Sequence, residues 1–261
     1  MRSFLKWPGG KAKIIDKLKP HLKGKRLVEP FVGGGSVFLN LEFDSYLLCD
    51  INVNLINTYN QIKEHKTKFI KDLAPLFTNG NDEKVYYKRR NEFNITDDLY
   101  RKAILFVYLN RHGFNGLCRY NKSGVYNVPF GWHKKPYFPK EELLFFLTIV
   151  DKCEFKAQSY TDTFKELKDD DVVYCDPPYY PEKKGYFVSY SREGFTVENQ
   201  VELRDLSEAA NCKVVLTNTL IDETKELYRA AEILEHKVGR SISRKGDGRK
   251  PTPEIIIIYK K

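Results

Sequence analysis

The sequence predicts an α/β protein with a doubly wound parallel sheet that is interrupted by a largely helical, basic insert. Strand-like apolar runs alternate with helical patterns in the first and last parts of the chain, which is typical of a parallel sheet. The alternation stops between about residues 66 and 151. Positive charge gathers in the same interval. Between Lys84 and Lys140 twelve lysines and arginines face three acids, so this excess of nine equals the net charge of the whole 261-residue chain.

Strands are expected where short runs of apolar, β-branched and aromatic residues end in polar or glycine-containing segments. These runs cover residues 26–31, 46–50, 154–157, 172–176, 213–218, 233–238 and 254–259. Helices are expected between them, near residues 11–21, 36–41, 52–66, 197–210 and 222–231. The four consecutive isoleucines at 255–258 suit a final strand that is buried on both faces.

The interval without alternation predicts helices at residues 83–93 and 99–111, followed by a hairpin with the turn Asn121-Lys122-Ser123-Gly124. A stretch rich in Gly, Lys, Arg and Ser, residues 240–253, predicts a mobile basic loop before the last strand. We therefore expect a discontinuous α/β domain and one insert. The domain would comprise residues 1–60 and 152–261, and the insert residues 61–151.

Composition excludes several classes of protein. Hydrophobic residues make up 41% of the chain, which is enough for a packed core and argues against disorder. No apolar run is as long as a membrane span, and the first residues lack the apolar segment of a signal peptide. The five cysteines are far apart, without the spacing of a zinc site or a disulfide framework. We therefore expect no bound metal, no membrane association and a cytoplasmic location.

The basic insert is interleaved with aromatic residues. Tyrosines, phenylalanines and one tryptophan recur between Tyr86 and Tyr137. Positive charge attracts phosphates and aromatic rings stack on bases, so this composition favours a nucleic-acid-binding lobe. The alternative is a solvated basic face whose aromatic rings simply belong to the core, and composition alone leaves both interpretations open.

A glycine-rich turn, Phe31-Val32-Gly33-Gly34-Gly35, follows the first predicted strand, and Asp50 ends the second. Glycines let a ligand approach the backbone closely, and an acid at this strand end can bind a ribose diol. The turn departs from the dinucleotide fingerprint and has no phosphate-binding lysine motif. A nucleoside without phosphates, such as S-adenosylmethionine, therefore fits better than NAD or ATP. A purely structural turn with a surface acid is the alternative.

The most informative motif is Asp176-Pro177-Pro178-Tyr179, at the end of the strand predicted over residues 172–176. The Asp176 side chain and the Pro177 carbonyl can each accept a hydrogen bond from one exocyclic amino group. The prolines stiffen the backbone, and the Tyr179 ring offers a face on which a base can stack. A proline-stiffened loop with a helix-capping acid is the alternative.

Together these motifs resemble the DNA adenine methyltransferases of the Dam family, and the resemblance spans nearly the whole chain. The matching stretches are residues 4–11, 27–40, 50–52, 108–111, 115–121, 127–131, 176–179 and 240–243. The resemblance implies a Rossmann-like, S-adenosylmethionine-dependent methyltransferase fold, with a target-recognition insert that contains the hairpin. In that family an Asp at the first position of the catalytic motif accompanies adenine as the substrate, and this chain has Asp176 there.

The resemblance also implies roles for particular residues. The catalytic residues would be Asp176, Pro177, Pro178 and Tyr179. The S-adenosylmethionine site would include Trp7, Lys11, Phe31, Gly33, Asp50, Ser159, Tyr160 and Asp176. Apart from the resemblance, Trp7 with the glycines and lysines of the segment from Lys6 to Lys11 is compatible with the wall of a pocket that holds the methionine carboxylate, but the segment taken alone favours a structural arm.

The residues expected to contact DNA are Lys6, Phe114, Asn115, Leu117, Arg119, Asn121, Pro129 and His133. Among them, the resemblance implies that Arg119 grips a guanine, that Lys6 contacts the other guanine of a GATC site, and that Phe114 wedges into the base stack. Trp132 and His133 depart from the residues that the family pattern leads us to expect after Pro129-Phe130-Gly131.

The expected activity is methyl transfer from S-adenosylmethionine to the 6-amino group of adenine that has been flipped out of duplex DNA. We expect a monomer in solution that associates with the nucleoid through DNA. Rival functions are methylation of an RNA base or of a protein glutamine, and DNA binding without catalysis. A solitary methylase and the partner of a restriction enzyme are equally compatible with the sequence.

Overall fold

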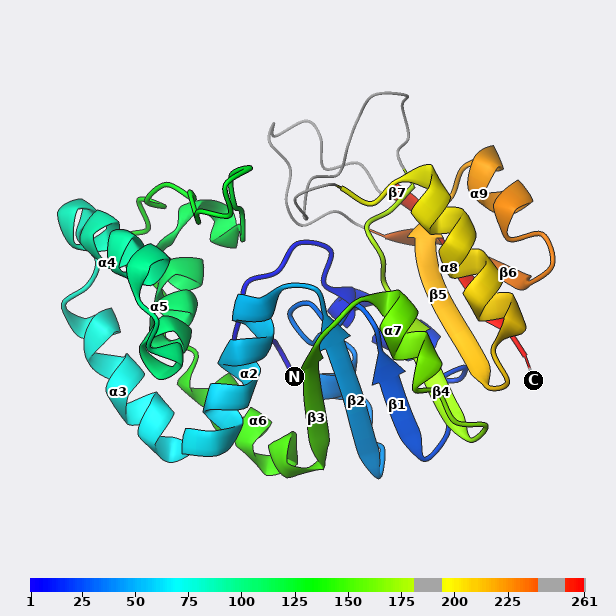
Figure 1. Ribbon diagram of the computed structural model, residues 1–261, viewed down its shortest axis with the longest axis horizontal. Coiled ribbons are helices and arrows are strands. Elements are labelled where there is room, and N and C mark those ends of the chain that lie inside the picture. Colours follow the sequence, from blue (N-terminus) through cyan, green and yellow to red (C-terminus); the bar gives the residue numbers. More distant parts are fainter. Residues whose placement is uncertain (181–193, 239–251, 261) are drawn as a thin grey trace.

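The computed structural model describes residues 1–180, 194–238 and 252–260. Its centre is a seven-stranded sheet with the strand order β3-β2-β1-β4-β5-β7-β6 (Figure 1). The strands are β1 (Arg26–Glu29), β2 (Ser45–Asp50), β3 (Cys153–Ala157), β4 (Asp171–Cys175), β5 (Lys213–Thr219), β6 (Glu232–Val238) and β7 (Thr252–Tyr259). All seven predicted strands are confirmed, and each end lies within two residues of the prediction.

The prediction of a wholly parallel sheet is wrong at one edge. Strands β1 to β5 pair in parallel, but β7 runs antiparallel to both β5 and β6. A parallel neighbour needs a crossover connection, usually a helix. Helix α9 (Asp222–Leu227) supplies one between β5 and β6, and β7 lies between those two strands. Ile255 to Ile258 of β7 are buried as expected.

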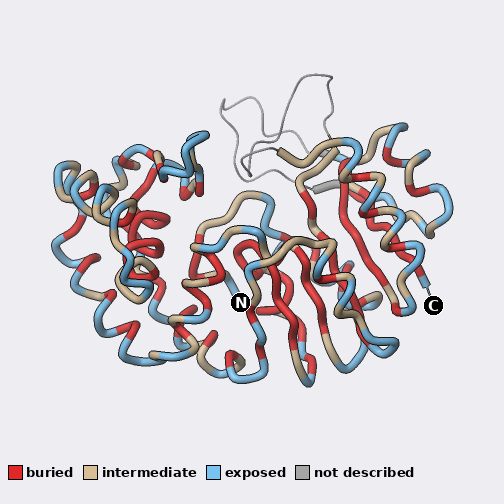
Figure 2. The backbone as a smooth tube through the Cα atoms, viewed as in Figure 1, coloured by how far each residue is buried: buried red, intermediate tan, exposed pale blue. Residues whose placement is uncertain are grey.

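Helices cover both faces of the sheet. One face packs against α7 (Tyr160–Lys165), α8 (Val197–Ala209) and α9, and the other packs against α1 (Ile15–Leu18) and α2 (Val53–His65). Figure 2 shows the strands as the most continuously buried part of the molecule. The chain leaves β1 toward β2 and β3 on one side and resumes with β4 on the other. Ligands of open α/β sheets bind at such a switch point, beyond the carboxyl ends of the strands.

The insert lies beside β3 and α2 (Figure 1). Its helices are α3 (Thr67–Thr78), α4 (Glu83–Ile95), α5 (Leu99–His112) and α6 (Lys140–Ile149), joined with the 3-10 turns η3 (Phe114–Gly116) and η4 (Val150–Lys152). Helices α4 and α5 confirm the predictions, whereas α3 and α6 were not predicted. Phe69, Phe106 and Phe146 of the insert belong to the same buried cluster as Phe38 and Tyr59, so insert and sheet share a core.

Three predicted helices are shorter than expected. The segment predicted as 11–21 forms only the 3-10 turn η1 (Lys11–Lys13) and α1, because Ile14 departs from helical geometry and Pro20 follows closely. The segment predicted as 36–41 forms the 3-10 turn η2 (Phe38–Asn40), and the helix predicted as 222–231 ends at Leu227. The predicted basic loop, residues 240–253, lies outside the described residues except for its last two positions.

The predicted hairpin is present, but it contains isolated bridges instead of strands. Tyr120 pairs with Tyr126, and Gly113 pairs with Phe130. The Asn121 side chain accepts hydrogen bonds from the backbone N–H groups of Ser123 (2.9 Å) and Val125 (2.9 Å), which closes the turn as an Asx turn does. Within the described ranges, no helix is both long and apolar enough to cross a membrane. The described acidic, histidine and cysteine side chains also form no cluster that could hold a metal ion.

Candidate active site and DNA interface

Asp176 lies just beyond the carboxyl end of β4, where its carboxylate has two partners. Lys11 forms an ion pair with Oδ1 (2.8 Å), and the Thr217 hydroxyl donates to the same oxygen (3.0 Å). Both contacts fall on Oδ1, so among the described residues Oδ2 is left for an incoming amino group. The Lys11 side chain is only 6% exposed, which makes the pair largely desolvated. The structure therefore brings together Lys11 and Asp176, which are far apart in the sequence.

The rest of the Asp176–Tyr179 motif is held by neighbouring elements. Gln200 on α8 donates to the Pro178 carbonyl (2.8 Å), and Asn218 on β5 donates to Gln200 (3.0 Å). The Asn218 oxygen also accepts from the backbone N–H of Tyr180 (3.0 Å). Sequence reasoning missed these supporting residues. Their signal was modest: the polar run Thr217-Asn218-Thr219 at the end of an otherwise apolar, buried strand.

The Tyr179 ring is fixed at both its hydroxyl and its face. Its hydroxyl donates to Glu254 on β7 (2.8 Å), and the Lys11 ammonium lies 4.8 Å from the ring centroid. Because the hydroxyl has an acceptor and the ring has a fixed orientation, the Tyr179 ring is a pre-organised stacking surface. Burial raises the pKa of Tyr179 well above its ordinary value, so the hydroxyl stays protonated as a donor.

The glycine turn lies directly against the N-terminal segment. A Cβ on Gly33 would lie 2.7 Å from Nε1 of Trp7, and one on Gly34 would lie 2.6 Å from Cβ of Trp7. Gly33 also adopts φ of +48°, which glycine tolerates best. The predicted proximity of Trp7 and Gly33 is therefore seen in the structure, and both glycines are required by the close approach.

Asp50 is at the end of β2, beside the same turn. Its two oxygens accept backbone hydrogen bonds, Oδ2 from Gly33 (3.0 Å) and Oδ1 from Asn52 (2.9 Å). Burial nevertheless raises the pKa of Asp50 to about 6. Each oxygen of a carboxylate has a second lone pair, so Asp50 can still accept hydrogen bonds from a diol. Near neutral pH it is charged and is oriented by the turn.

Three aromatic rings form a cluster beside the turn. Phe31 stacks on Tyr160 with centroids 5.5 Å apart, and Phe195 packs against both rings. Phe195 was not predicted as a site residue. Ser159 caps α7 by accepting from the backbone N–H of Asp162 (3.1 Å), and this cap places Tyr160 at the first turn of the helix. The predicted cofactor residues therefore gather around the carboxyl ends of β1, β2 and β4 and the start of α7.

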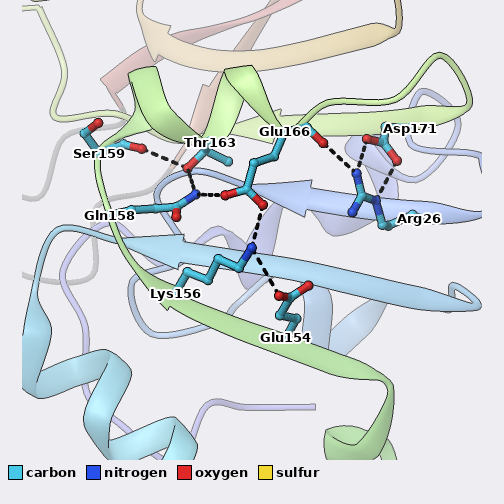
Figure 3. A network of polar contacts seen from close by, with 8 residues as sticks. All are labelled: Arg26, Glu154, Lys156, Gln158, Ser159, Thr163, Glu166 and Asp171. Atoms are coloured by element: carbon cyan, nitrogen blue, oxygen red, sulfur yellow. Dashed lines mark hydrogen bonds and ion pairs between the residues drawn. The ribbon is translucent and has the colours of Figure 1, made fainter.

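A polar network holds α7 against the sheet (Figure 3). Glu166 accepts from Lys156 on β3 (2.5 Å) and from Gln158 (3.0 Å), and Gln158 also donates to Thr163 (3.2 Å). The Glu166 carbonyl accepts from Arg26 on β1 (3.1 Å). Helix α7 is thus tied to two strands, which positions Ser159 and Tyr160 relative to the glycine turn.

The N-terminal segment, residues 3–11, connects the two halves of the site. Asn110 on α5 accepts from the Lys6 backbone N–H (2.7 Å) and donates to its carbonyl (2.8 Å). Arg111 donates to the Phe4 carbonyl through Nε (2.8 Å). The same segment supplies Trp7 to the glycine turn and Lys11 to Asp176. The structural-arm interpretation and the pocket interpretation of this segment are therefore compatible.

Except for Lys6 of the N-terminal segment, the predicted DNA-contacting residues lie between α5 and α6, at the end of the molecule where the parallel strands reach their carboxyl ends (Figure 1). Arg119 is exposed, and Asn127 orients its guanidinium by accepting from Nε at Oδ1 (2.7 Å) and from Nη2 at the backbone carbonyl (3.2 Å). Lys6 contacts the His133 ring (3.3 Å), and burial lowers the pKa of both groups. Asn127 was not among the predicted contacts.

The remaining predicted contacts have mixed surroundings. Phe114 is 45% exposed, and its backbone N–H donates to the Pro129 carbonyl (2.9 Å). Asn115 is exposed with φ of +53°. The Leu117 carbonyl accepts from the Tyr126 hydroxyl (3.1 Å). The structure brings these residues to one segment together with Arg119 and His133, whereas the Asn121 side chain is engaged in the turn.

The fold and the site define an α/β enzyme with a glycine turn and an acid beside the switch point of the sheet, and a second acid that can hold an amino group. They also include a basic segment between α5 and α6, residues 113–139, which we call the recognition segment. A family model described as D12 class N6 adenine-specific DNA methyltransferase matches residues 7–242. The chain therefore belongs to that family, and it is an adenine-specific DNA methyltransferase that uses a methyl donor. This assignment rejects the RNA, protein and non-catalytic alternatives.

Curated relatives agree along the full length. The DNA adenine methylase of Vibrio cholerae is 44% identical over 265 residues, which cover 99% of this chain and 96% of the relative. That of Escherichia coli K12 is 45% identical, covering 99% and 95%, and that of Serratia marcescens is 42% identical, covering 99% and 98%. Among solved structures, a precorrin-6y C5,15-methyltransferase from Geobacter metallireducens aligns over 96% of this chain and 86% of its own, with 11% identity and a TM-score of 0.38. That likeness is too low to support an argument.

Proposed function

We propose that the methyl donor is S-adenosylmethionine and that the acceptor is the adenine of GATC in duplex DNA, flipped into the site between β4 and the glycine turn. The observation that carries the proposal is the Asp176 carboxylate at the carboxyl end of β4, where Lys11 and Thr217 hold Oδ1 and leave Oδ2 to an incoming amino group. An amino group that donates to Oδ2 would lie at the switch point of the sheet, where such folds bind ligands.

The residues around the turn fit an adenosyl group without phosphates. Trp7 packs so closely against Gly33 and Gly34 that neither glycine could carry a side chain. Two backbone donors hold the Asp50 carboxylate, which would accept hydrogen bonds from the ribose diol. Phe31 and Tyr160 offer aromatic surface for an adenine ring. When bound, S-adenosylmethionine supplies an electrophilic methyl group on a sulfonium centre.

The chain's own residues would orient the acceptor amino group. Tyr179, fixed by Glu254 and Lys11, stacks on the extruded adenine. Asp176 Oδ2 and the Pro177 carbonyl accept hydrogen bonds from the two amino hydrogens, which aims the nitrogen lone pair at the methyl group. As the bond from the nitrogen to the methyl carbon forms, the methyl–sulfur bond would break and leave a neutral thioether. The nitrogen would then carry the positive charge until it releases one proton to water. A carboxylate at hydrogen-bonding distance stabilises that charge.

The recognition segment would read the target through Arg119. A guanidinium donates two hydrogen bonds to the major-groove acceptors of guanine, and Asn127 holds this one in a fixed plane. Lys6, supported by His133, would contact the second guanine, and Phe114 would enter the base stack. The catalytic domain would then comprise residues 1–60 and 152–261, with residues 61–151 as the recognition insert. We propose that the enzyme acts as a monomer.

The test is methyl transfer from labelled S-adenosylmethionine to two duplexes that differ only at the adenine of a single GATC. We expect label on the intact duplex alone. Equal label on both would overturn the target assignment but leave the methyltransferase. Absence of label on both, with S-adenosylmethionine bound in calorimetry, would overturn the acceptor assignment.

A further inference from the structure

Trp132 is a large apolar side chain that the proposed mechanism does not use. Its side chain is 72% exposed, more than the other exposed aromatic residues of the insert, Phe114 at 45% and Tyr137 at 50%. Tyr137 has partners within the protein, because its hydroxyl donates to Glu142 (3.0 Å) and its ring faces the Arg111 guanidinium. Leaving an indole in water forgoes a large burial of apolar surface, so its exposure calls for an explanation.

The backbone at Trp132 is strained. Its φ is +51°, in the left-handed region that a residue with a side chain rarely adopts. Such conformations persist where the surroundings enforce them, and they concentrate at functional sites. Here both neighbours are fixed. Gly131 donates to the His112 carbonyl (2.9 Å), and the His133 carbonyl accepts from Asn81 (2.8 Å).

The turn also restricts where the indole can lie. A Cβ on Gly131 would lie 2.7 Å from the carbonyl oxygens of both His112 and Gly113, so the chain is pressed against the end of α5. The Phe130 ring contacts the indole edge to face, with centroids 5.2 Å apart and an interplanar angle of 69°. One side of the indole is therefore supported by protein, and most of its surface faces solvent.

The surroundings of Trp132 favour nucleic acid as the partner. Next in the chain are His133, which contacts Lys6, and the exposed Lys134 and Lys135. The bridge between Gly113 and Phe130 places the turn beside the segment that carries Phe114. Positive charge next to an exposed indole suits a phosphate backbone with an adjacent base face.

We propose that Trp132 stacks on a base of the bound duplex, as a second aromatic contact beside Phe114, and that it stabilises the DNA from which the adenine has been extruded. This inference rests on the recognition segment of the proposed function. Extrusion leaves unstacked base faces at the site, and an indole held at a fixed position can cover one of them. The contact does not depend on base identity, since every base has an aromatic face.

Fluorescence offers a direct test, because the chain has two tryptophans. In a Trp7→Phe variant all indole emission comes from Trp132, and we expect duplex DNA to quench it. In an otherwise unaltered chain, Trp132→Ala should weaken DNA binding by about tenfold or more, the effect of losing one base–aromatic contact. Trp132→Tyr should retain most of the affinity. Unquenched emission, or Trp132→Ala binding within about twofold of the parent, would overturn the proposal.

Three further variants separate stacking from other causes. Trp132→Gly relieves the backbone strain and should bind DNA as weakly as Trp132→Ala; parent-like binding would overturn the proposal. Leu144→Ala, which truncates a 43%-exposed side chain on α6, should bind normally. Arg119→Ala tests the recognition segment itself. Weak binding by Arg119→Ala with normal binding by Trp132→Ala would reject only this inference, whereas normal binding by both would reject the placement of the DNA.

Discussion

The proposed catalytic loop, Asp176 to Tyr179, and the recognition segment hold their charged side chains in opposite ways. In the catalytic loop the Asp176 carboxylate is paired with Lys11, a buried cation at 2.8 Å. At the recognition segment two cations have neutral partners: the Asn127 amide for Arg119, and the His133 ring for Lys6 of the N-terminal segment. Desolvation lowers the pKa of His133, which keeps that ring neutral near pH 7.

Under the proposed function, this difference lets one surface attract DNA and still use a carboxylate. Pairing with Lys11 offsets the negative charge of Asp176, which would otherwise repel phosphates. Neutral partners fix the direction of Arg119 and Lys6 and leave their charge available to the duplex. Elsewhere the chain pairs cations with carboxylates, as in the bidentate contact of Arg26 with Asp171 or the contact of Lys66 with Asp151. Such pairs serve the fold, because their charge is already balanced.

The largest expected effect is at the catalytic loop. Asp176→Asn removes the charge but preserves the shape, so kcat should fall by at least about a hundredfold, since a charge-stabilising contact is lost in the transition state. DNA affinity should not fall, because loss of the carboxylate leaves the Lys11 charge unpaired, and a positive charge attracts phosphates. Labelled methyl transfer and DNA binding would be measured in parallel. Normal turnover would reject the mechanism, and a fall in DNA affinity would break the contrast between the two regions.

Arg119→Ala should affect discrimination more than turnover. Loss of a bidentate guanine contact corresponds to about 1–3 kcal/mol, or roughly 5- to 150-fold in preference for the correct base. The measurement is kcat/KM on GATC and on duplexes with either guanine changed. Unaltered preference at both positions would remove Arg119 from the readout.

Asn127→Asp sharpens the comparison with a single isosteric change. It gives Arg119 a carboxylate partner, so the guanidinium charge should become less available to phosphates. The slope of log K for DNA binding against log salt concentration should therefore become smaller in magnitude by about 1. Asp151→Asn is the matched control, because it makes the reverse exchange at the Lys66 pair. Asp151 lies just before the amino end of β3, outside the recognition segment, so the slope should stay unchanged. An unchanged slope in Asn127→Asp would mean that the neutral partner has no bearing on DNA binding.

The smallest effect concerns pH. Burial raises the pKa of Asp50 to about 6, so acidification protonates the acid proposed to bind the ribose. The affinity for S-adenosylmethionine should fall below pH 6, by at most about tenfold per pH unit. The Asp50→Asn variant should lose this pH dependence. Because the pKa of Asp50 is raised in the folded state, protonation of this group stabilises the fold as pH falls. A loss of affinity for S-adenosylmethionine at low pH would therefore not result from unfolding linked to Asp50. Calorimetry at pH 5.5 and 7.5 would measure it; equal affinities would exclude the role of Asp50.

Sequence reasoning succeeded where a local pattern carries the information. Strand positions, the glycine turn and the Asp176–Tyr179 motif depend on short runs of residues, and the structure has them at the ends of β1 and β4. The antiparallel placement of β7 could not be predicted from such local patterns. It depends on which strands pair with each other, and the alternation of strands and helices along the chain does not encode that pairing. The missed helix α3 contains Pro75, which weakens a helical pattern.

The supporting residues were missed for a related reason. Gln200 and Glu254 are ordinary polar residues in the sequence, without a motif around them. Asn218 lies in the polar run 217–219, and Asn127 lies in a stretch that matches the family, but neither pattern indicates a supporting role. Their roles arise from contacts across the fold, such as Gln200 with the Pro178 carbonyl and Glu254 with the Tyr179 hydroxyl. Tertiary contacts of this kind become visible only when distant segments are placed side by side.

The N-terminal segment has a consequence for the order in which the protein is completed during synthesis. Its residues are translated before their partners: Phe4 and Lys6 take their places only when Arg111 and Asn110 have been made, and Lys11 only when Asp176 has. Such long-range contacts form slowly. The segment would therefore dock after elements that are translated later. A nascent chain that stops before β4 would have Lys11 without its partner Asp176, so a methylase of this design becomes competent only after β4 has been made.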